Sequence, residues 1–231
     1  AAVAAILVTA LLAYYLIPGT AEEMLLARAG DEVEQVSLAD GSSILLRPHS
    51  AAYERPSGSS DYVVRLEGEA YFDVVTKPDR SFGVETAHGA VRVLGTAFSV
   101  RTWGGRTEVF LERGALSVEH ARSLESAVLS PGMAALLEER GITVSDDGDA
   151  AEYRDWIRGE LTFVERPARR VVAELAHHFD LSIDLQEPLA NETITGSLTL
   201  DSAEAALSEL ALVLGAEISG SREAGFVVRA R

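Results

Sequence analysis

The sequence predicts a mainly β chain, with an all-β sandwich or β-roll domain followed by a small α+β domain of βαβ-βαββ order, behind one N-terminal transmembrane helix. Three observations lead to this fold class. Residues 1–17 are apolar except for Thr9, residues 33–144 alternate short apolar runs with turn residues, and a helical period begins after residue 166. The expected bounds are 1–18 for the membrane helix, 28–145 for the β domain, 146–158 for a linker and 159–231 for the α+β domain.

The N-terminal apolar run is close to the length of a membrane span. Its residues would extend roughly 25 Å as a helix, slightly short of a hydrocarbon core of about 30 Å. The chain starts with Ala1, so we expect upstream sequence to complete the span. A signal peptide and a buried helix are the alternatives, but no basic segment precedes the run in this sequence. The first charges after it are Glu22 and Glu23, which favours export of the residues that follow.

The middle of the chain has the pattern of short, half-buried strands. Turn residues such as Asp40-Gly41 and Gly104-Gly105 interrupt it about every eight to twelve residues. Gly95 is expected to bend or bulge a strand. The expected strands include 43–47, 62–66, 70–75, 90–94, 97–101, 107–111 and 116–119.

An acidic stripe lies within this region. Glu67, Glu69, Tyr71 and Asp73 alternate with apolar residues and should share one strand face. The simpler interpretation is a face in contact with solvent. The alternative is an acid/base pair of a carbohydrate-binding or hydrolysing domain, formed by Glu67 and Glu69 with Trp103 nearby.

In the last third of the sequence, the hydrophobic pattern predicts alternating strands and helices. We expect strands at 161–164, 181–185 and 193–200, a helix at 167–179, and a closing hairpin of 216–219 and 226–229. A second helix should begin at Asp201 or Ser202, with Glu204 completing a capping box, and end at Gly215.

Composition excludes several functions. Lys and Arg total 20 against 36 Asp and Glu, and the net charge of −16 argues against a nucleic-acid partner. Without cysteine there is no disulfide, thiolate metal site or Cys nucleophile. The five histidines form no metal motif, and His177 and His178, adjacent on a helix, are expected to be exposed or to cap it. We therefore expect no enzyme activity, no metal and no cofactor.

Six segments, taken in order, resemble the FecR family of transmembrane sigma-factor regulators, which are anti-sigma factors. The two most specific are LEGEAYFDV at 66–74 and VLGTAFSV at 93–100. The final domain resembles the short N-terminal domain of secretins and TonB-dependent receptors. The other four segments are DGSSILL at 40–46, FGVET at 82–86, LSPG at 129–132 and WIRGELTF at 156–163.

The resemblance implies a single-pass protein of the bacterial inner membrane with most of its chain in the periplasm. Such proteins receive a signal from the signalling domain of an outer-membrane TonB-dependent transducer, usually in response to an iron–siderophore. Regulated proteolysis then releases an extracytoplasmic-function sigma factor. The cytoplasmic domain that binds the sigma factor in this family is not in this sequence.

Partner contact is expected in the final domain. Strand addition along 193–200 would use Ile194, Thr195, Ser197, Leu198 and Thr199. The helix at 167–179 is an alternative surface, carrying Leu175 and Phe179. A structural scaffold of stacked β units is a further alternative for the whole chain.

Overall fold

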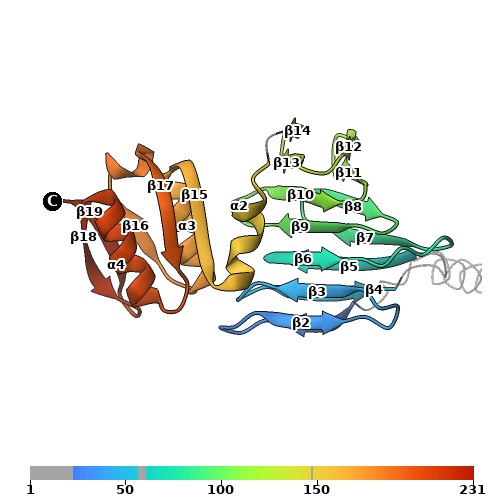
Figure 1. Cartoon of the computed structure of the whole chain (residues 1–231), viewed down its shortest axis with the longest axis horizontal. Coiled ribbons are helices and arrows are strands. Elements are labelled where there is room, and N and C mark those ends of the chain that lie inside the picture. The colour runs from blue at the N-terminus through green and yellow to red at the C-terminus, as the bar shows by residue number, and fades with distance from the viewer. Residues whose placement is uncertain (1–22, 57–60, 147) are drawn as a thin grey trace, which may run out of the picture.

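A computed structural model describes residues 23–56, 61–146 and 148–231. The predicted membrane helix at 1–18 lies outside these ranges. Within them, no helix is both long enough and apolar enough to cross a bilayer. The mainly β character predicted from the sequence is confirmed, since most elements are strands arranged in several sheets (Figure 1).

The larger part of the chain forms two seven-stranded sheets, which we call the sandwich. The strand pairs are antiparallel except β5–β7, which is parallel. The first sheet runs β1 (Met24–Arg28), β4 (Ala51–Arg55), β5 (Asp61–Glu67), β7 (Ser81–Glu85), β8 (Gly89–Val93), β11 (Leu116–His120) and β12 (Ser126–Leu129). The second runs β14 (Gly141–Ser145), β13 (Ala134–Glu138), β10 (Thr107–Arg113), β9 (Ala97–Arg101), β6 (Glu69–Asp73), β3 (Ser43–Leu46) and β2 (Glu34–Ser37).

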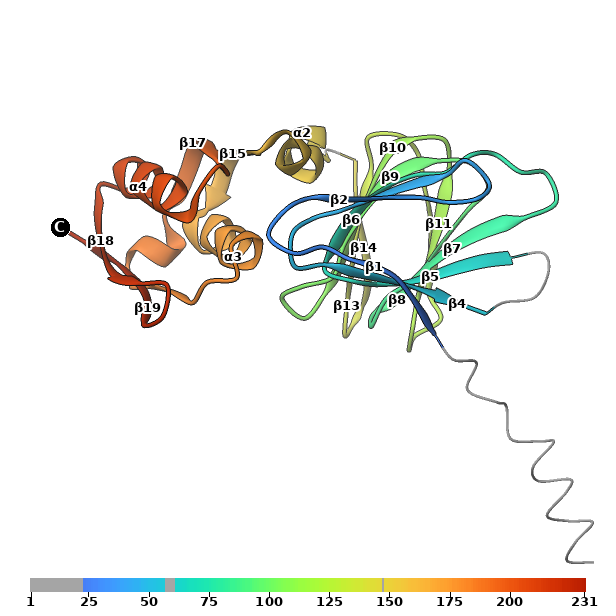
Figure 2. The same ribbon diagram turned by 90° about the horizontal axis from the view of Figure 1, so that it is seen from below.

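The two sheets face each other across one apolar core (Figure 2). Phe72 of β6 stacks on Phe98 of β9 with ring centroids 5.0 Å apart, and it meets the edge of Phe82 from the first sheet at 6.0 Å. Offset and edge contacts between aromatic rings are the favoured geometries. The alternating strand pattern therefore buries one face of each sheet against the other.

Gly95 lies where the chain crosses from the first sheet to the second, between β8 and β9. A Cβ on this residue would lie 2.6 Å from Cα of Thr76 and closer still to its hydroxyl oxygen. The next residue, Thr96, donates its hydroxyl to the carbonyl of Ala115 at 2.9 Å. Gly95 thus allows a close backbone approach at a crossing between sheets, not the bend or bulge within a strand that the sequence suggested.

A short helical segment leads from the sandwich to the elements from β15 onward, which we call the C-terminal domain. This connecting segment consists of α2 (Ala150–Arg154) and the 3₁₀ turn η1 (Asp155–Arg158). The domain has a two-stranded sheet, β15–β17, and a three-stranded sheet in the order β16–β19–β18. Its elements are β15 (Glu160–Pro167), α3 (Ala168–His178), β16 (Ile183–Leu185), η2 (Leu189–Asn191), β17 (Thr193–Thr199), α4 (Ala203–Leu214), β18 (Ala216–Ser221) and β19 (Gly225–Ala230).

The ends of α4 show how the local sequence sets this domain. Ser202 is the N-cap and accepts a hydrogen bond from the Ala205 amide at 3.2 Å. Gly215 ends the helix in the left-handed conformation with φ of 59°. Of the two residues expected to start the helix, Ser202 provides the cap rather than Asp201. The domain's apolar core includes Trp156, Phe163, Leu175, Leu198 and Leu210.

Candidate functional site

The predicted partner-binding residues divide into a buried and an exposed group. Ile194 and Leu198 of β17 are 7% and 1% exposed, and Leu175 of α3 is fully buried. These three pack in the domain core, so they support a surface rather than form it. Thr195, Ser197 and Thr199 are exposed and Phe179 is half-buried, all four accessible from outside. The predicted alternation of β17 is therefore present.

One end of the outer edge of β17 is already occupied. Leu200 donates its amide to Gly159 on the β15 side at 2.7 Å, so the amide of Thr199 points to the other side. There it donates to Glu209 Oε2 of α4 at 2.7 Å, and the Thr199 hydroxyl donates to Glu209 Oε1 at 3.1 Å. A carboxylate that fills an edge position blocks an incoming strand there. The open part of this edge is the stretch around Ser197.

The helix α4 carries an apolar face that the periodicity did not reveal. Leu212 is 76% exposed and Val213 is 39% exposed. Leu212 lines a groove of about 580 Å³ between α4 and β18, together with Ala211, Ile218 and Phe226. We call Leu212, Val213 and this groove the α4 surface. Sequence reasoning found the buried positions of α4 but passed over the Leu212-Val213 pair between them. Those two residues place apolar side chains on the outer side of the helix, where Glu204, Ser208 and Glu209 are the polar neighbours, while its other side packs in the domain core.

A second unusual feature is a buried cluster of charges where the sandwich meets the C-terminal domain. We call this cluster the ionic network. Charged side chains are seldom buried unless they are paired with one another. Its members are Arg47, Glu69, Arg101, Glu108, Glu152, Arg166, Arg170 and Glu174.

Glu69 lies at the centre of the sandwich side of this network. It is fully buried and accepts from Arg47 Nη1 at 2.7 Å and from Arg101 Nη2 at 3.2 Å. The expectation that Glu69 belongs to a solvated strand face is therefore wrong. Glu67 is exposed, ends β5 in the other sheet and accepts from Arg65 at 2.6 Å. The two carboxylates have different surroundings and do not form the acid/base pair considered above.

Glu174 brings the C-terminal domain into the network. Its Oε1 lies 3.3 Å from Arg101 Nη1 of the sandwich and 2.8 Å from Arg166 Nη1 of its own domain. Its Oε2 is 3.5 Å from Arg47 Nη1. A single carboxylate on α3 is thus shared by three guanidinium groups from two domains.

Further pairs surround this centre. Arg170 of α3 donates to Glu108 Oε1 of β10 at 2.8 Å. Arg166 Nη2 pairs with Glu152 Oε2 of α2 at 2.6 Å. Burial opposes ionisation of Glu108, but Arg101, Arg106 and Arg170 outweigh it and lower its pKa. Burial raises the pKa of Glu152 by more than Arg166 and Arg101 lower it.

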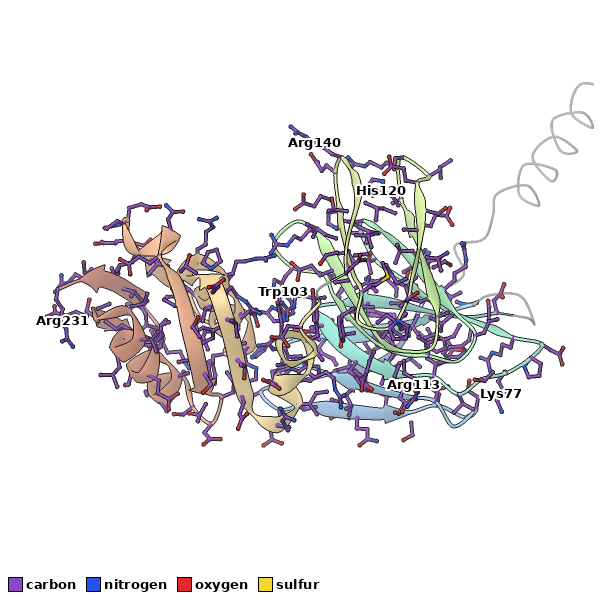
Figure 3. The ribbon with its side chains drawn as sticks, turned by 45° about the horizontal axis from the view of Figure 1, so that its top comes forward. Lys77, Trp103, Arg113, His120, Arg140 and Arg231 are labelled. Carbon is purple, nitrogen blue, oxygen red and sulfur yellow. The ribbon has the colours of Figure 1, made fainter. Side chains whose placement is uncertain are left out.

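The two histidines and Trp103 complete the same region. Trp103, from the turn between β9 and β10, stacks on His177 with ring centroids 4.0 Å apart, and Arg101 lies over its ring at 4.9 Å. Figure 3 shows Trp103 on the side of the sandwich that meets the C-terminal domain. His178 Nδ1 accepts from Arg47 Nε at 3.3 Å. Trp103 therefore belongs to the domain contact and does not line a sugar-binding groove.

Both histidines are held neutral by this environment. Burial, followed by the nearby Arg47, lowers the pKa of His177 and of His178 to about 3. The expectation of exposed or helix-capping histidines is wrong, because contact with the sandwich buries His178 and partly buries His177. Within the described ranges no three His, Asp or Glu residues are arranged to hold a metal ion.

The comparisons with known proteins support the family resemblance of the sandwich. A sequence model of the FecR protein family matches residues 26–117, which span most of the sandwich. The chain contains a FecR-family domain. The matched segment includes Glu69 and Arg101, so half of the ionic network is built on the FecR domain itself.

Two crystal structures share the whole arrangement. Both are of a candidate anti-sigma factor from Parabacteroides distasonis, at 2.50 and 1.65 Å resolution. Each is 24% identical to this chain with a TM-score of 0.77; they cover 91% and 90% of this chain, and this chain covers 100% and 99% of them. The likeness therefore extends over the FecR domain and the C-terminal domain together. The comparison with curated proteins gave no match.

Proposed function

We propose that this chain is the signal-receiving part of a FecR-type anti-sigma regulator. In this proposal the apolar run at 1–17 anchors it in the inner membrane and the rest of the chain lies in the periplasm. Its partner is the signalling domain of an outer-membrane TonB-dependent transducer, and a cytoplasmic domain beyond this sequence binds the sigma factor. The observation that carries the proposal is the uncovered apolar α4 surface on a domain joined to a FecR domain.

The α4 surface has the properties of a protein-binding site. Leu212 and Val213 place apolar side chains in solvent next to a groove, an arrangement typical of interaction sites on otherwise soluble domains. The open stretch of the β17 edge around Ser197 gives a second possible mode, by strand addition. A helix-face contact and a strand-edge contact can be separated by single substitutions.

The position of the C-terminal domain fits a receiving role. It projects from one end of the sandwich, while β1 begins on the side of the sandwich away from it (Figure 2). A partner that binds α4 would therefore act on the far end of the molecule from the residues that lead to the proposed anchor. The FecR domain would transmit the signal between them.

Calorimetric titration of residues 23–231 with the signalling domain of a TonB-dependent transducer from the same organism tests this function. We expect Leu212→Asp to weaken binding at least about tenfold, because an ionised carboxylate in an apolar contact must be desolvated. Leu124→Asp is the matched control, since Leu124 is 73% exposed on the sandwich. No binding by the unmodified protein would refute the transducer as partner. Equal loss in both variants would refute the α4 surface.

A second substitution distinguishes strand addition from helix contact. Ser197→Pro removes an outward amide from the open part of the β17 edge while leaving α4 unchanged. Loss of binding by Ser197→Pro with a normal circular dichroism spectrum would indicate strand addition. Unchanged binding by Ser197→Pro together with loss by Leu212→Asp would assign the contact to the helix face.

A further inference from the structure

The contact between the FecR domain and the C-terminal domain has two chemically different halves. One half is apolar and lies along the covalent connection. There Tyr71 and Leu45 of the second sheet pack against the apolar core of the C-terminal domain, which includes Trp156 of η1. Tyr71 also donates to Glu112 at 2.8 Å, and Arg154 of α2 pairs with the same carboxylate.

The other half is the ionic network, in which some pairs, such as Arg47–Glu69, lie within one domain and others form only when the two domains are together. Arg101–Glu174, Arg47–Glu174 and Glu108–Arg170 all join the sandwich to α3. If the two domains separated, the charged side chains on each surface would be solvated by water. The ionic half therefore gains less net free energy from contact than its number of pairs suggests, because desolvation offsets the attraction.

The network is also incompletely satisfied. Within the described part of the chain, four buried polar atoms make no hydrogen bond: Arg47 Nη2, Arg101 Nε, Glu174 Oε2 and His177 Nε2. An unsatisfied buried polar atom costs free energy that it would recover in water. Three of these atoms belong to the network, where Glu174 Oε2 keeps only its ion pair with Arg47, and the fourth is on His177 beside it. Opening this half therefore releases a cost that opening the apolar half does not.

Space for movement lies directly beside the network. A cleft of about 550 Å³ separates the two domains, with Leu136 and Thr143 of the sandwich on one side and Val164 and Arg170 of the C-terminal domain on the other. Glu108, Glu152 and Arg166 of the network also line it. On this side the domains meet through charges, open space and one aromatic contact, the stack of Trp103 on His177, which opening would also have to break.

We infer that this joint is a hinge with an ionic latch. The apolar contact around Tyr71 and Trp156 is the hinge, and the charge pairs that Glu174 and Arg170 make with the sandwich are the latch. Opening breaks the latch, widens the cleft and leaves both domains folded, because each keeps its own apolar core. The inference does not depend on the identity of the partner and would stand if the transducer proposal failed.

Distance measurement between two spin labels tests the latch. The chain has no cysteine, so Thr143→Cys and Val164→Cys can each carry a label, one on either side of the cleft. The latch variant is Glu174→Gln, which removes the shared negative charge and keeps the side-chain size. The control is Glu204→Gln, because Glu204 is an exposed residue of the same domain in the first turn of α4. Residues 23–231 are used throughout.

We expect a single short distance between the two labels in the labelled protein without a further substitution and in its Glu204→Gln variant. In the Glu174→Gln variant we expect a longer distance or a second one. Limited proteolysis should show new cleavage within 146–159 in Glu174→Gln alone. An unchanged distance in folded Glu174→Gln would overturn the inference. If that variant does not fold, Arg170→Gln, which removes only the pair with Glu108, decides by the same two measurements: a shift supports the latch and no shift overturns it.

Discussion

The indole of Trp103 stacks on the imidazole of His177, and through this contact the turn between β9 and β10 reaches α3 of the other domain. The turn is sharp because Gly104 and Gly105 both have positive φ, at 69° and 73°. Trp103 also lies under the guanidinium groups of Arg47 and Arg101, at 5.4 and 4.9 Å. The indole thus shields one face of His177 and two central cations of the network from water.

The lowered pKa values of His177 and His178 predict a loss of stability in mild acid. Their folded pKa of about 3 lies below the ordinary value of 6.5, so the unfolded chain binds more protons below pH 6.5. The stabilisation is complete above that pH and is lost as pH falls towards 3. Each histidine should contribute up to about 1.4 kcal/mol per pH unit. Glu152, whose pKa is raised, acts in the opposite sense.

Guanidinium unfolding at about pH 7.5 and about pH 5.5 checks this. The double variant His177→Gln/His178→Gln should lose most of the difference between the two pH values. An equal difference in the double variant would assign the acid sensitivity to other groups.

Glu69→Gln should destabilise the protein far more than Glu67→Gln. The first change leaves Arg47 and Arg101 buried with less compensating charge, which costs about 3–5 kcal/mol. The second removes an exposed pair with Arg65, worth about 1 kcal/mol or less. Chemical unfolding of the two variants measures the difference. If both variants lost a similar free energy of unfolding, the buried charge of Glu69 would not be needed to compensate Arg47 and Arg101.

Gly95→Ala should be poorly tolerated because its Cβ would press on the backbone of Thr76. We expect a loss of about 1–3 kcal/mol from overpacking. Gly30→Ala is the matched control, because a Cβ on Gly30 meets nothing within 4 Å. Thermal unfolding of both variants tests the assignment, and a stable Gly95→Ala variant would show that the crossing between the sheets can relax.

Ser202→Ala should cost about 1 kcal/mol, since it removes the cap on the Ala205 amide. Asp201→Ala should have little effect, because Asp201 does not cap α4. Chemical unfolding followed by circular dichroism compares the two. The reverse order of effects would place the start of the helix one residue earlier.

Local patterning predicted much of the fold. The seven strands expected between residues 43 and 119 correspond to β3, β5, β6, β8, β9, β10 and β11. The C-terminal hairpin and the glycine that ends α4 also lie where the sequence put them. These features depend on the hydrophobic period and on turn residues within a short stretch of chain. They can therefore be predicted without knowing which distant segments pack against them.

The ionic network could not be found in this way. Its central groups lie 32 residues apart, for Glu69 and Arg101, and 73 residues apart, for Arg101 and Glu174. In sequence, Glu69 sits in an alternating strand and resembles any solvent-facing carboxylate. His177 and His178 likewise resemble surface residues of an amphipathic helix, because the surface that covers them comes from a different domain.

The sequence by itself therefore determined the β-rich class, the negative net charge, the helix–strand order of the last third and the motifs of the FecR domain. Tertiary structure alone decided that Glu69 and His178 are buried, that Ile194 and Leu198 are core residues, and that Leu212 is exposed. The physical reason is that alternation shows which residues share a face, whereas the burial of that face depends on which distant segment packs against it.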